Sequence, residues 1–272
     1  MIINCLKNFL ISQSFVLAIT NPDHEVFLIF AKTVGFFNTS KIPVVDAILS
    51  YTNVHINYVN IYEYSENTPL ESWVQDGILF NSTYVVTHTS DILRFLSLWR
   101  YTGTYIDLDV IIQKPIVDLG TNFACVQADN YINSAFMNLD MNGRRIAEKF
   151  FDRTVKSFNP TVWIDNGPGA ITKIIHEICN TSDSSQMTRD NCEGFAVLPT
   201  RECYEINYPE WKKFFDESSV DEVFRRIQNS TVVHFWNFMS SKEKLQTTSK
   251  SAYIKLAQKY CPKVLKAAGE FF

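Results

Sequence analysis

The sequence of 272 residues is 46% hydrophobic and 20% charged, a composition typical of a globular protein with a large core. Its formal net charge of −4 at pH 7 and its scattered Lys and Arg residues provide no clustered basic surface, so we expect no nucleic-acid partner. No run of about 18 apolar residues occurs, so no stretch is predicted to span a bilayer.

Short β-rich runs alternate with helical patterns along the chain, and no repeat or linker divides it. The expected strands are Val26–Ala31, Val54–Ile61, Tyr105–Ile112, Phe123–Gln127, Ala135–Leu139, Phe195–Leu198 and Val232–Trp236. The expected helices are Asp91–Tyr101, Arg144–Lys156, Ala170–Cys179, Asp221–Gln228 and Ser251–Tyr260. This alternation predicts an α/β fold with a mostly parallel central sheet flanked by helices, in which ligands bind at the carboxyl ends of strands.

The six cysteines form no Cys-x-x-Cys pair and show no zinc-ligand spacing. Cys179 and Cys192 instead bracket a polar loop that a disulfide could close, which would stabilise the fold by lowering the entropy of the unfolded chain. Such a bond would indicate an oxidising compartment.

A helix is expected to begin at Ser90, a good N-cap residue, and to end at Gly103. Asp91 suits the first turn, and Arg94 lies three residues further on the same face. The pair is either a surface ion pair worth less than about 1 kcal/mol or, because the helix leads into the next motif, a site for phosphate or sugar hydroxyl groups.

The strand after this helix contains an Asp-x-Asp motif, Asp107 and Asp109. Residues two apart in a strand point to the same side, so both carboxylates are predicted to share one face. Two carboxylates so close repel each other and lose hydration, and Mg²⁺ or Mn²⁺ would relieve both costs with coordination sites left for a diphosphate. The alternative is that both side chains face water, since an Asp-x-Asp triplet alone is a weak motif.

Two further segments carry polar residues with two interpretations each. His234 and Trp236 are predicted on one face of a short apolar strand, either as core residues or as a ligand of Mn²⁺ and a donor to a phosphate oxygen. Asp165 and Asn166 precede Gly167 in a turn, where they either serve the turn itself or contact an acceptor substrate as candidate catalytic residues.

The stretch SDILRFLSLWRYTGTYIDLDVIIQKPI resembles the sugar-binding region of the α1,4-glycosyltransferase family, because a Ser-Asp-x-x-Arg helix precedes its Asp-x-Asp. The likeness runs from roughly residue 20 to the C-terminus, through Asn133–Phe136, Gly167-Pro168, Phe195–Pro199, Tyr208–Phe215, His234–Asn237 and Tyr260–Pro262. Two glycines usually precede the motif strand in this family, and here Thr102 takes the first position.

The resemblance implies a GT-A type nucleotide-sugar-binding fold that uses Mn²⁺ or Mg²⁺. It implies a retaining hexosyltransferase that moves galactose, N-acetylgalactosamine or N-acetylglucosamine from a UDP-sugar to a glycosphingolipid such as lactosylceramide, or to a glycoprotein, in an α1,4 linkage. By position, the donor-binding residues would be Asp91, Arg94, Tyr105, Asp107 and Trp236, and the metal ligands Asp107, Asp109 and His234.

The family also implies a place in the cell. Its members are Golgi membrane proteins with a lumenal catalytic domain, which predicts a Golgi-lumen, membrane-associated enzyme whose N-terminal anchor this sequence does not contain. Residues 21–272 are expected to form a single catalytic domain, whereas residues 1–20 fit the family poorly and suggest a truncated gene model.

Two other functions remain open at this point. The Asp-x-Asp strand also fits a haloacid-dehalogenase-like phosphatase with the first aspartate as nucleophile, although no Asp-Asp or Gly-Asp dipeptide supplies its later acidic pair. A non-catalytic UDP-sugar or carbohydrate-binding protein on a transferase fold is the second alternative.

Overall fold

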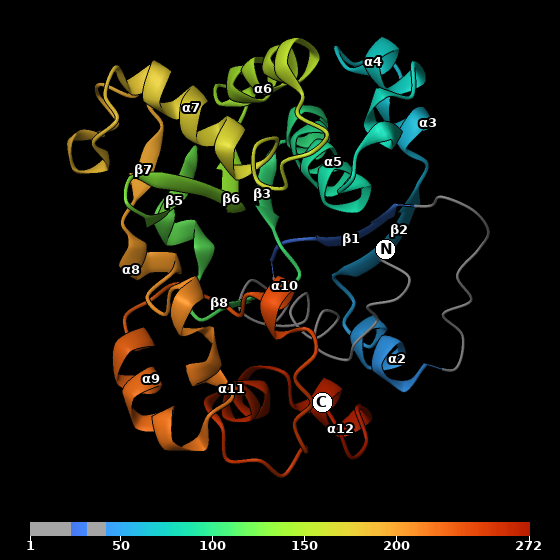
Figure 1. Cartoon of the computed structure of the whole chain (residues 1–272). Helices are drawn as coiled ribbons and strands as arrows, with labels where there is room; N and C mark the ends of the chain where they lie inside the picture. Colours follow the sequence, from blue (N-terminus) through green and yellow to red (C-terminus); the bar gives the residue numbers. More distant parts are fainter. Residues whose placement is uncertain (1–22, 32–41) are drawn as a thin grey trace.

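The computed structural model describes residues 23–31 and 42–272, so the predicted N-terminal segment 1–20 lies outside the described residues. Helices pack around strands in an α/β arrangement, as the alternation of elements predicts (Figure 1). No helix of the described part is long and apolar enough to cross a bilayer.

The strands of residues 23–31 and 42–272 form three small sheets. In the largest, the order is β3 (Gly103–Ile106), β6 (Tyr131–Leu139), β5 (Phe123–Ala128) and β7 (Ala196–Leu198). The other two sheets pair β1 (Val26–Ala31) with β2 (Val54–Val59), and β4 (Val110–Ile112) with β8 (Val232–His234).

The prediction of a mostly parallel sheet is wrong in detail, because only β1–β2 and β5–β7 run parallel among the described pairs. The β3–β6, β5–β6 and β4–β8 pairs are antiparallel. A tight hairpin, absent from the sequence-based elements, joins β5 to β6 through Asp129 and Asn130, whose φ angles are 44° and 65°. Positive φ at both central residues suits a two-residue hairpin turn, and such a turn forces its strands to run antiparallel.

The helices flank these sheets (Figure 1). In the first half of the chain they are α2 (Pro43–Leu49), α3 (Ile61–Ser65), α4 (Glu71–Gln75) and α5 (Val85–Tyr101). They continue with α6 (Arg144–Ser157), α7 (Pro168–Cys179), α8 (Thr200–Cys203), α9 (Val220–Ile227), α10 (Asn237–Ser240), α11 (Ala252–Tyr260) and α12 (Pro262–Ala267). Short 3₁₀ segments are η2 (Ile78–Asn81), η3 (Ile116–Leu119), η4 (Ser184–Gln186), η5 (Tyr208–Phe214) and η6 (Glu217–Ser219).

The helix before the Asp-x-Asp motif begins earlier than predicted. Helix α5 starts at Val85, so Ser90 is an interior residue and not the N-cap. The buried residues of α5 include Phe95, whose ring stacks on Phe150 of α6 with centroids 3.6 Å apart. This packing fixes α5 against α6 and so holds its polar residues at one position.

The Asp-x-Asp motif is a turn between two sheets, and the prediction of one strand from Tyr105 to Ile112 is wrong. Strand β3 ends at Ile106 where its pairing with β6 ends, and β4 begins at Val110 to pair with β8. The chain therefore leaves one sheet for another at Asp107–Asp109, and this crossing, not strand alternation, sets the direction of the carboxylates.

The described part of the chain contains two disulfides. The predicted Cys179–Cys192 bond is present, and a second bond links Cys125 of β5 to Cys203 of α8. The second closes 78 residues of chain and ties α8 to the sheet beside the β4–β8 pair. Cys261 is buried.

Candidate functional site

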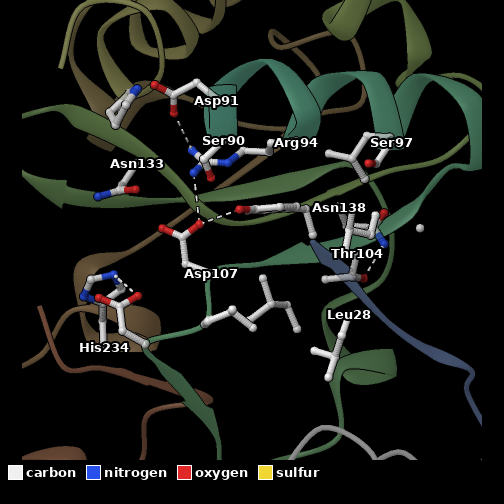
Figure 2. A pocket seen from close by; sticks show the side chains of 18 of the residues that line it. Leu28, Ser90, Asp91, Arg94, Ser97, Thr104, Asp107, Asn133, Asn138 and His234 are labelled. Atoms are coloured by element: carbon white, nitrogen blue, oxygen red, sulfur yellow. Dashed lines mark hydrogen bonds and ion pairs between the residues drawn. The ribbon is translucent and has the colours of Figure 1, made fainter. Parts of the chain in front are cut away.

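A large cavity of about 2120 Å³ lies at the Asp107–Asp109 turn. Its lining includes residues of β1, β2, α5, β3, the loop before α7 and the segment after β8. Figure 2 shows Asp91, Arg94, Asp107 and His234 gathered on its wall from segments far apart in the sequence. The cavity thus lies where the β3–β6–β5–β7 sheet meets the β4–β8 pair.

Backbone contacts hold Asp109 in place. Its Oδ2 accepts a hydrogen bond of 2.7 Å from the amide of Asn237, and its carbonyl accepts one of 2.8 Å from the amide of Phe235. The side chain is almost fully buried. The segment after β8 therefore fixes Asp109 directly, although it lies more than a hundred residues further along the chain.

Asp107, Asp109 and His234 offer ligand atoms that all lie within 4.8 Å of one another. His234 Nε2 lies 3.4 Å from Asp109 Oδ1. Two carboxylate oxygens with one imidazole nitrogen form a donor set that suits Mn²⁺ or a related divalent ion, so these residues fit the metal that the Asp-x-Asp motif implies. The structure brings together all three residues predicted as metal ligands.

The two carboxylates are the better prepared ligands of the three. His234 Nδ1 accepts a hydrogen bond of 3.1 Å from the amide of Trp236, which in a neutral ring places the hydrogen on Nε2. His234 can bind a cation through Nε2 only when that hydrogen moves to Nδ1 and the Trp236 contact is given up.

Arg94 connects the helix α5 to the carboxylate turn. Its Nη2 lies 2.9 Å from Asp107 Oδ1, its Nη1 lies 3.3 Å from Asp91 Oδ1, and Nη1 also donates to Ser134 Oγ. The Tyr105 hydroxyl donates to the same Asp107 Oδ1 at 2.7 Å, and the guanidinium lies 4.6 Å from the Tyr105 ring centre. Asp107 Oδ1 thus accepts hydrogen bonds from two donors. The second carboxylate oxygen, Oδ2, is therefore the one that suits a ligand.

Asp91, Arg94 and Asp107 are buried, so their charges are balanced differently from those of an exposed ion pair. Burial raises the pKa of the Asp91 carboxyl to about 7, although Arg94 acts to lower it. Burial also raises the pKa of Asp107, again opposed by Arg94. The two carboxylates are poorly solvated, and a cation beside them would favour their charged forms.

Asp91 packs against a glycine that no other residue could replace without displacement. A Cβ on Gly167 would lie 2.2 Å from Asp91 Oδ1. Asp91 is 2% exposed, and its Oδ2 has no hydrogen-bond partner among the described residues although the side chain lines the cavity. A buried acceptor without a donor is costly, so the arrangement suits a ligand hydroxyl group.

Trp236 lies in the cavity wall, and its indole N–H, predicted as a donor to a phosphate oxygen, has an acceptor within the protein. The Nε1–H group donates to the carbonyl of Ile206 at 2.9 Å. Trp236 was expected to end the strand Val232–Trp236, but β8 ends at His234 and Trp236 adopts φ 55°. Its ring packs on His234 with centroids 4.2 Å apart. Its contacts position His234.

Asp165 and Asn166, predicted on the acceptor side, are not among the residues that line the cavity. Asn166 is buried, donates to His88 and to the carbonyl of Asn159, and accepts from the amide of Asn159. Asp165 Oδ2 accepts from Asn159 Nδ2 at 3.0 Å. The turn itself uses both side chains, as the alternative interpretation of this segment states.

Two cavity residues were not singled out from the sequence. The Tyr131 hydroxyl and the Trp163 indole N–H are buried without a hydrogen-bond partner in the described part of the chain. Both line the same cavity as Asp91. Isolated aromatic residues carry no sequence signal for a site, because a role in the core is far commoner.

Comparisons with known proteins agree with this geometry. A family model described as "Glycosyltransferase sugar-binding region containing DXD motif" matches residues 12–126, and one described as "Alpha 1,4-glycosyltransferase conserved region" matches residues 140–268. The chain thus carries both of these glycosyltransferase regions. The first match contains α5 and the Asp107–Asp109 turn, and the second contains His234 and α10.

Named relatives are similar at modest identity. Lactosylceramide 4-alpha-galactosyltransferase of Mus musculus is 30% identical over 217 residues, which cover 80% of this chain and 59% of the relative. Alpha-1,4-N-acetylglucosaminyltransferase of Homo sapiens is 23% identical over 230 residues, 84% of this chain and 66% of the relative. The match thus spans about six-tenths of the mouse relative's own length.

Among solved structures, the PaToxG glycosyltransferase aligns with a TM-score of 0.46 and 17% identity over 83% of each chain. The strands and helices of this chain by themselves show its α/β architecture.

Proposed function

We propose that this chain is a hexosyltransferase that moves a sugar from a UDP-sugar to a glycan acceptor with the aid of a divalent cation. The observation that carries the proposal is the cluster of Asp107, Asp109 and His234, whose ligand atoms lie within 4.8 Å of one another in a large cavity. Both matched glycosyltransferase regions support it, and both α1,4-transferase relatives act on sugars by name.

The chain's own residues would divide the work as follows. Asp107 and Asp109 hold the cation, with His234 as a third ligand, and a bound cation would offset the negative charge that develops on the departing UDP. Arg94 and Tyr105 orient Asp107 through its Oδ1. Asp91 offers Oδ2 to a hydroxyl group of the donor sugar.

The finer details rest on the family. We propose Mn²⁺ as the cation, UDP-galactose as the donor and a glycosphingolipid such as lactosylceramide as the acceptor, joined in an α1,4 linkage with retention. The names of the mouse and human relatives support galactose and N-acetylglucosamine as the two donor sugars to compare first. Residues 21–272 would form one catalytic domain.

A Golgi-lumen location, with membrane association through an N-terminal anchor, is part of the same proposal. Two disulfides support an oxidising compartment, because such bonds are rare in the cytosol. Asn81, Asn180 and Asn229 stand in Asn-x-Ser/Thr sequons and are exposed, so each is open to glycosylation in a secretory compartment.

The test is a panel of UDP-sugars, each with Mn²⁺, against lactosylceramide and against N-acetylhexosamine-terminated glycolipids. We expect transfer from one donor above the rest, and loss of transfer in Asp109→Asn without loss of the folded state. Full turnover in Asp109→Asn, or transfer unaffected by a chelator, would refute the metal-dependent proposal.

A further inference from the structure

The cavity is larger than one nucleotide-sugar site requires. Its volume of about 2120 Å³ exceeds the range of roughly 300–1,000 Å³ that is usual for a small-molecule pocket. Charged residues around Asp107 account for only part of its wall. Another part consists of aromatic and aliphatic side chains, which include Trp163, Ile164, Phe238 and Met239.

Two of these residues form a stacked pair. The rings of Trp163 and Phe238 lie with centroids 4.1 Å apart and planes inclined by 20°. Trp163 comes from the loop before α7 and Phe238 from α10, so the pair joins two distant segments at the cavity. Phe238 remains 65% exposed although one face is stacked, which leaves most of a flat apolar ring open to a ligand.

The pair lies beside the carboxylate turn. Asn237, whose amide donates to Asp109 Oδ2 at 2.7 Å, is the residue before Phe238. Consecutive Cα atoms are about 3.8 Å apart, so Phe238 begins within one residue of the segment that holds Asp109. An acceptor sugar must bring its hydroxyl group close to the donor carbon next to the diphosphate, and this position meets that requirement.

The chemistry of the pair fits a pyranose ring. One face of a hexose presents C–H groups, which pack on an aromatic face, while its hydroxyl groups project from the edge and need polar partners. The buried Nε1–H of Trp163 has no acceptor in the described part of the chain, and a hydroxyl group at this edge would provide one. A lipid chain would leave that N–H unsatisfied.

We propose that Phe238, backed by Trp163, is the stacking surface for the terminal pyranose ring of the acceptor glycan. This assignment rests on the proposed function, because it presumes a sugar acceptor. It adds a subsite that is separate from the donor-binding residues Asp91 and Arg94, and it gives α10 a part in the choice of acceptor.

The experiment uses lactose as a lipid-free acceptor probe. The dissociation constant of lactose is measured by ligand-observed NMR in the presence of UDP and Mn²⁺, and UDP-galactose hydrolysis without acceptor is measured separately. For Phe238→Ala we expect lactose to bind roughly ten-fold more weakly, with hydrolysis within about two-fold of wild type. Phe80→Ala is the matched control, since Phe80 is an exposed ring stacked on Tyr62 outside the cavity lining.

Two further variants test the nature of the contact. Phe238→Leu keeps an apolar side chain without an aromatic face, and we expect it to bind lactose nearly as weakly as Phe238→Ala. Trp163→Phe keeps a ring but removes the N–H, and we expect a loss of about three-fold. Because a merely structural role would lower thermal stability together with binding, Tm is recorded for each variant.

The outcomes test the acceptor subsite at Phe238 separately from the proposed transfer reaction. Unchanged lactose binding in Phe238→Ala would overturn the subsite, and so would full recovery in Phe238→Leu or an equal loss of donor hydrolysis. If wild type shows no turnover of any UDP-sugar but Phe238→Ala still weakens lactose binding, the subsite stands and the transfer reaction falls.

Discussion

Arg94 and Asp107 form a buried ion pair in which Nη2 lies 2.9 Å from Oδ1. The arginine is 5% exposed, and its Nη1 contacts Asp91 and Ser134, whereas Nε has no hydrogen-bond partner among the described residues. The protein itself thus provides partners for both Nη groups. Arg94 therefore acts on the carboxylate turn before any ligand is bound. Its main task is to set the orientation of Asp107.

Arg94→Lys should weaken metal-dependent activity although the charge is kept. A lysine ammonium cannot span Asp91 and Asp107 with two separate N–H groups, so Asp107 would lose its fixed orientation. Loss of such an outer contact typically costs about 10–100-fold in metal affinity or activity. The measurement is the Mn²⁺ concentration for half-maximal transfer in wild type and variant.

Arg226→Lys provides the matched control for that substitution. Arg226 belongs to an ion-pair network with Glu205 and Glu210 outside the cavity lining, so the same chemical change there should leave the Mn²⁺ dependence unaltered. An equal shift in both variants would mean that the effect is general and that Arg94 has no special link to the metal site.

Gly167→Ala should disturb the same site from the opposite side. The new Cβ would lie 2.2 Å from Asp91 Oδ1, and relief of this clash must move Asp91 and with it Arg94. Overpacking of this kind costs about 1–3 kcal/mol of stability, and we expect transfer per folded molecule to fall at least ten-fold.

Gly143→Ala distinguishes a local from a general effect of crowding. A Cβ there would lie 2.0 Å from Asn122 Oδ1, a comparable clash at the start of α6 outside the cavity lining. Stability should fall by a similar amount, while transfer per folded molecule stays near the wild-type value. Equal activity losses would remove the argument that Gly167 acts through Asp91.

Much of the fold followed from periodicity, because α6 and α7 present long apolar faces that no other element type fits. The sheet directions did not, because the Asp129-Asn130 turn lacks the glycine that usually marks a hairpin. Pairing partners are also non-local. No pattern within residues 105–112 states that β3 pairs with β6 while β4 pairs with β8.

The candidate site, like the fold, could be predicted from the sequence only in part. Asp107 and Asp109 could be selected because two close carboxylates require a physical explanation, whatever their exact backbone conformation. Asn166 was selected for its place before a helix. In the folded chain, its side chain instead donates hydrogen bonds to the buried His88 ring and to the backbone carbonyl of Asn159. Phe238 was not selected, since an exposed aromatic becomes informative only when the folded chain sets it beside a cavity.

Asp91→Asn should change how stability depends on pH. Burial raises the pKa of Asp91 to about 7, above the value of about 3.9 for an unfolded aspartate, so the folded protein binds this proton more tightly. The resulting stabilisation is complete below about pH 4 and is lost as the pH rises through about 7. Asparagine has no such proton to lose.

The free energy of unfolding of Asp91→Asn relative to wild type should therefore increase between pH 4 and pH 8. Denaturant titrations of both proteins at these two pH values measure the change. Parallel pH profiles would show that Asp91 is charged in the folded protein across the whole range and that Arg94 outweighs the burial.

Thr102→Gly should stabilise the protein. Thr102 adopts φ 58° and ψ −170°, a region that is nearly confined to glycine and costs a branched residue about 1–3 kcal/mol. Glycine removes that strain but adds entropy to the unfolded chain, at most about 1 kcal/mol, so we expect a net gain of roughly 1 kcal/mol in the free energy of unfolding.

Thr104→Gly is the control, because Thr104 lies in β3 outside the positive-φ positions and its Oγ1 accepts a hydrogen bond from Asn138. That variant should lose stability, and an equal loss in Thr102→Gly would mean that the contacts of the Thr102 side chain outweigh the strain of its backbone.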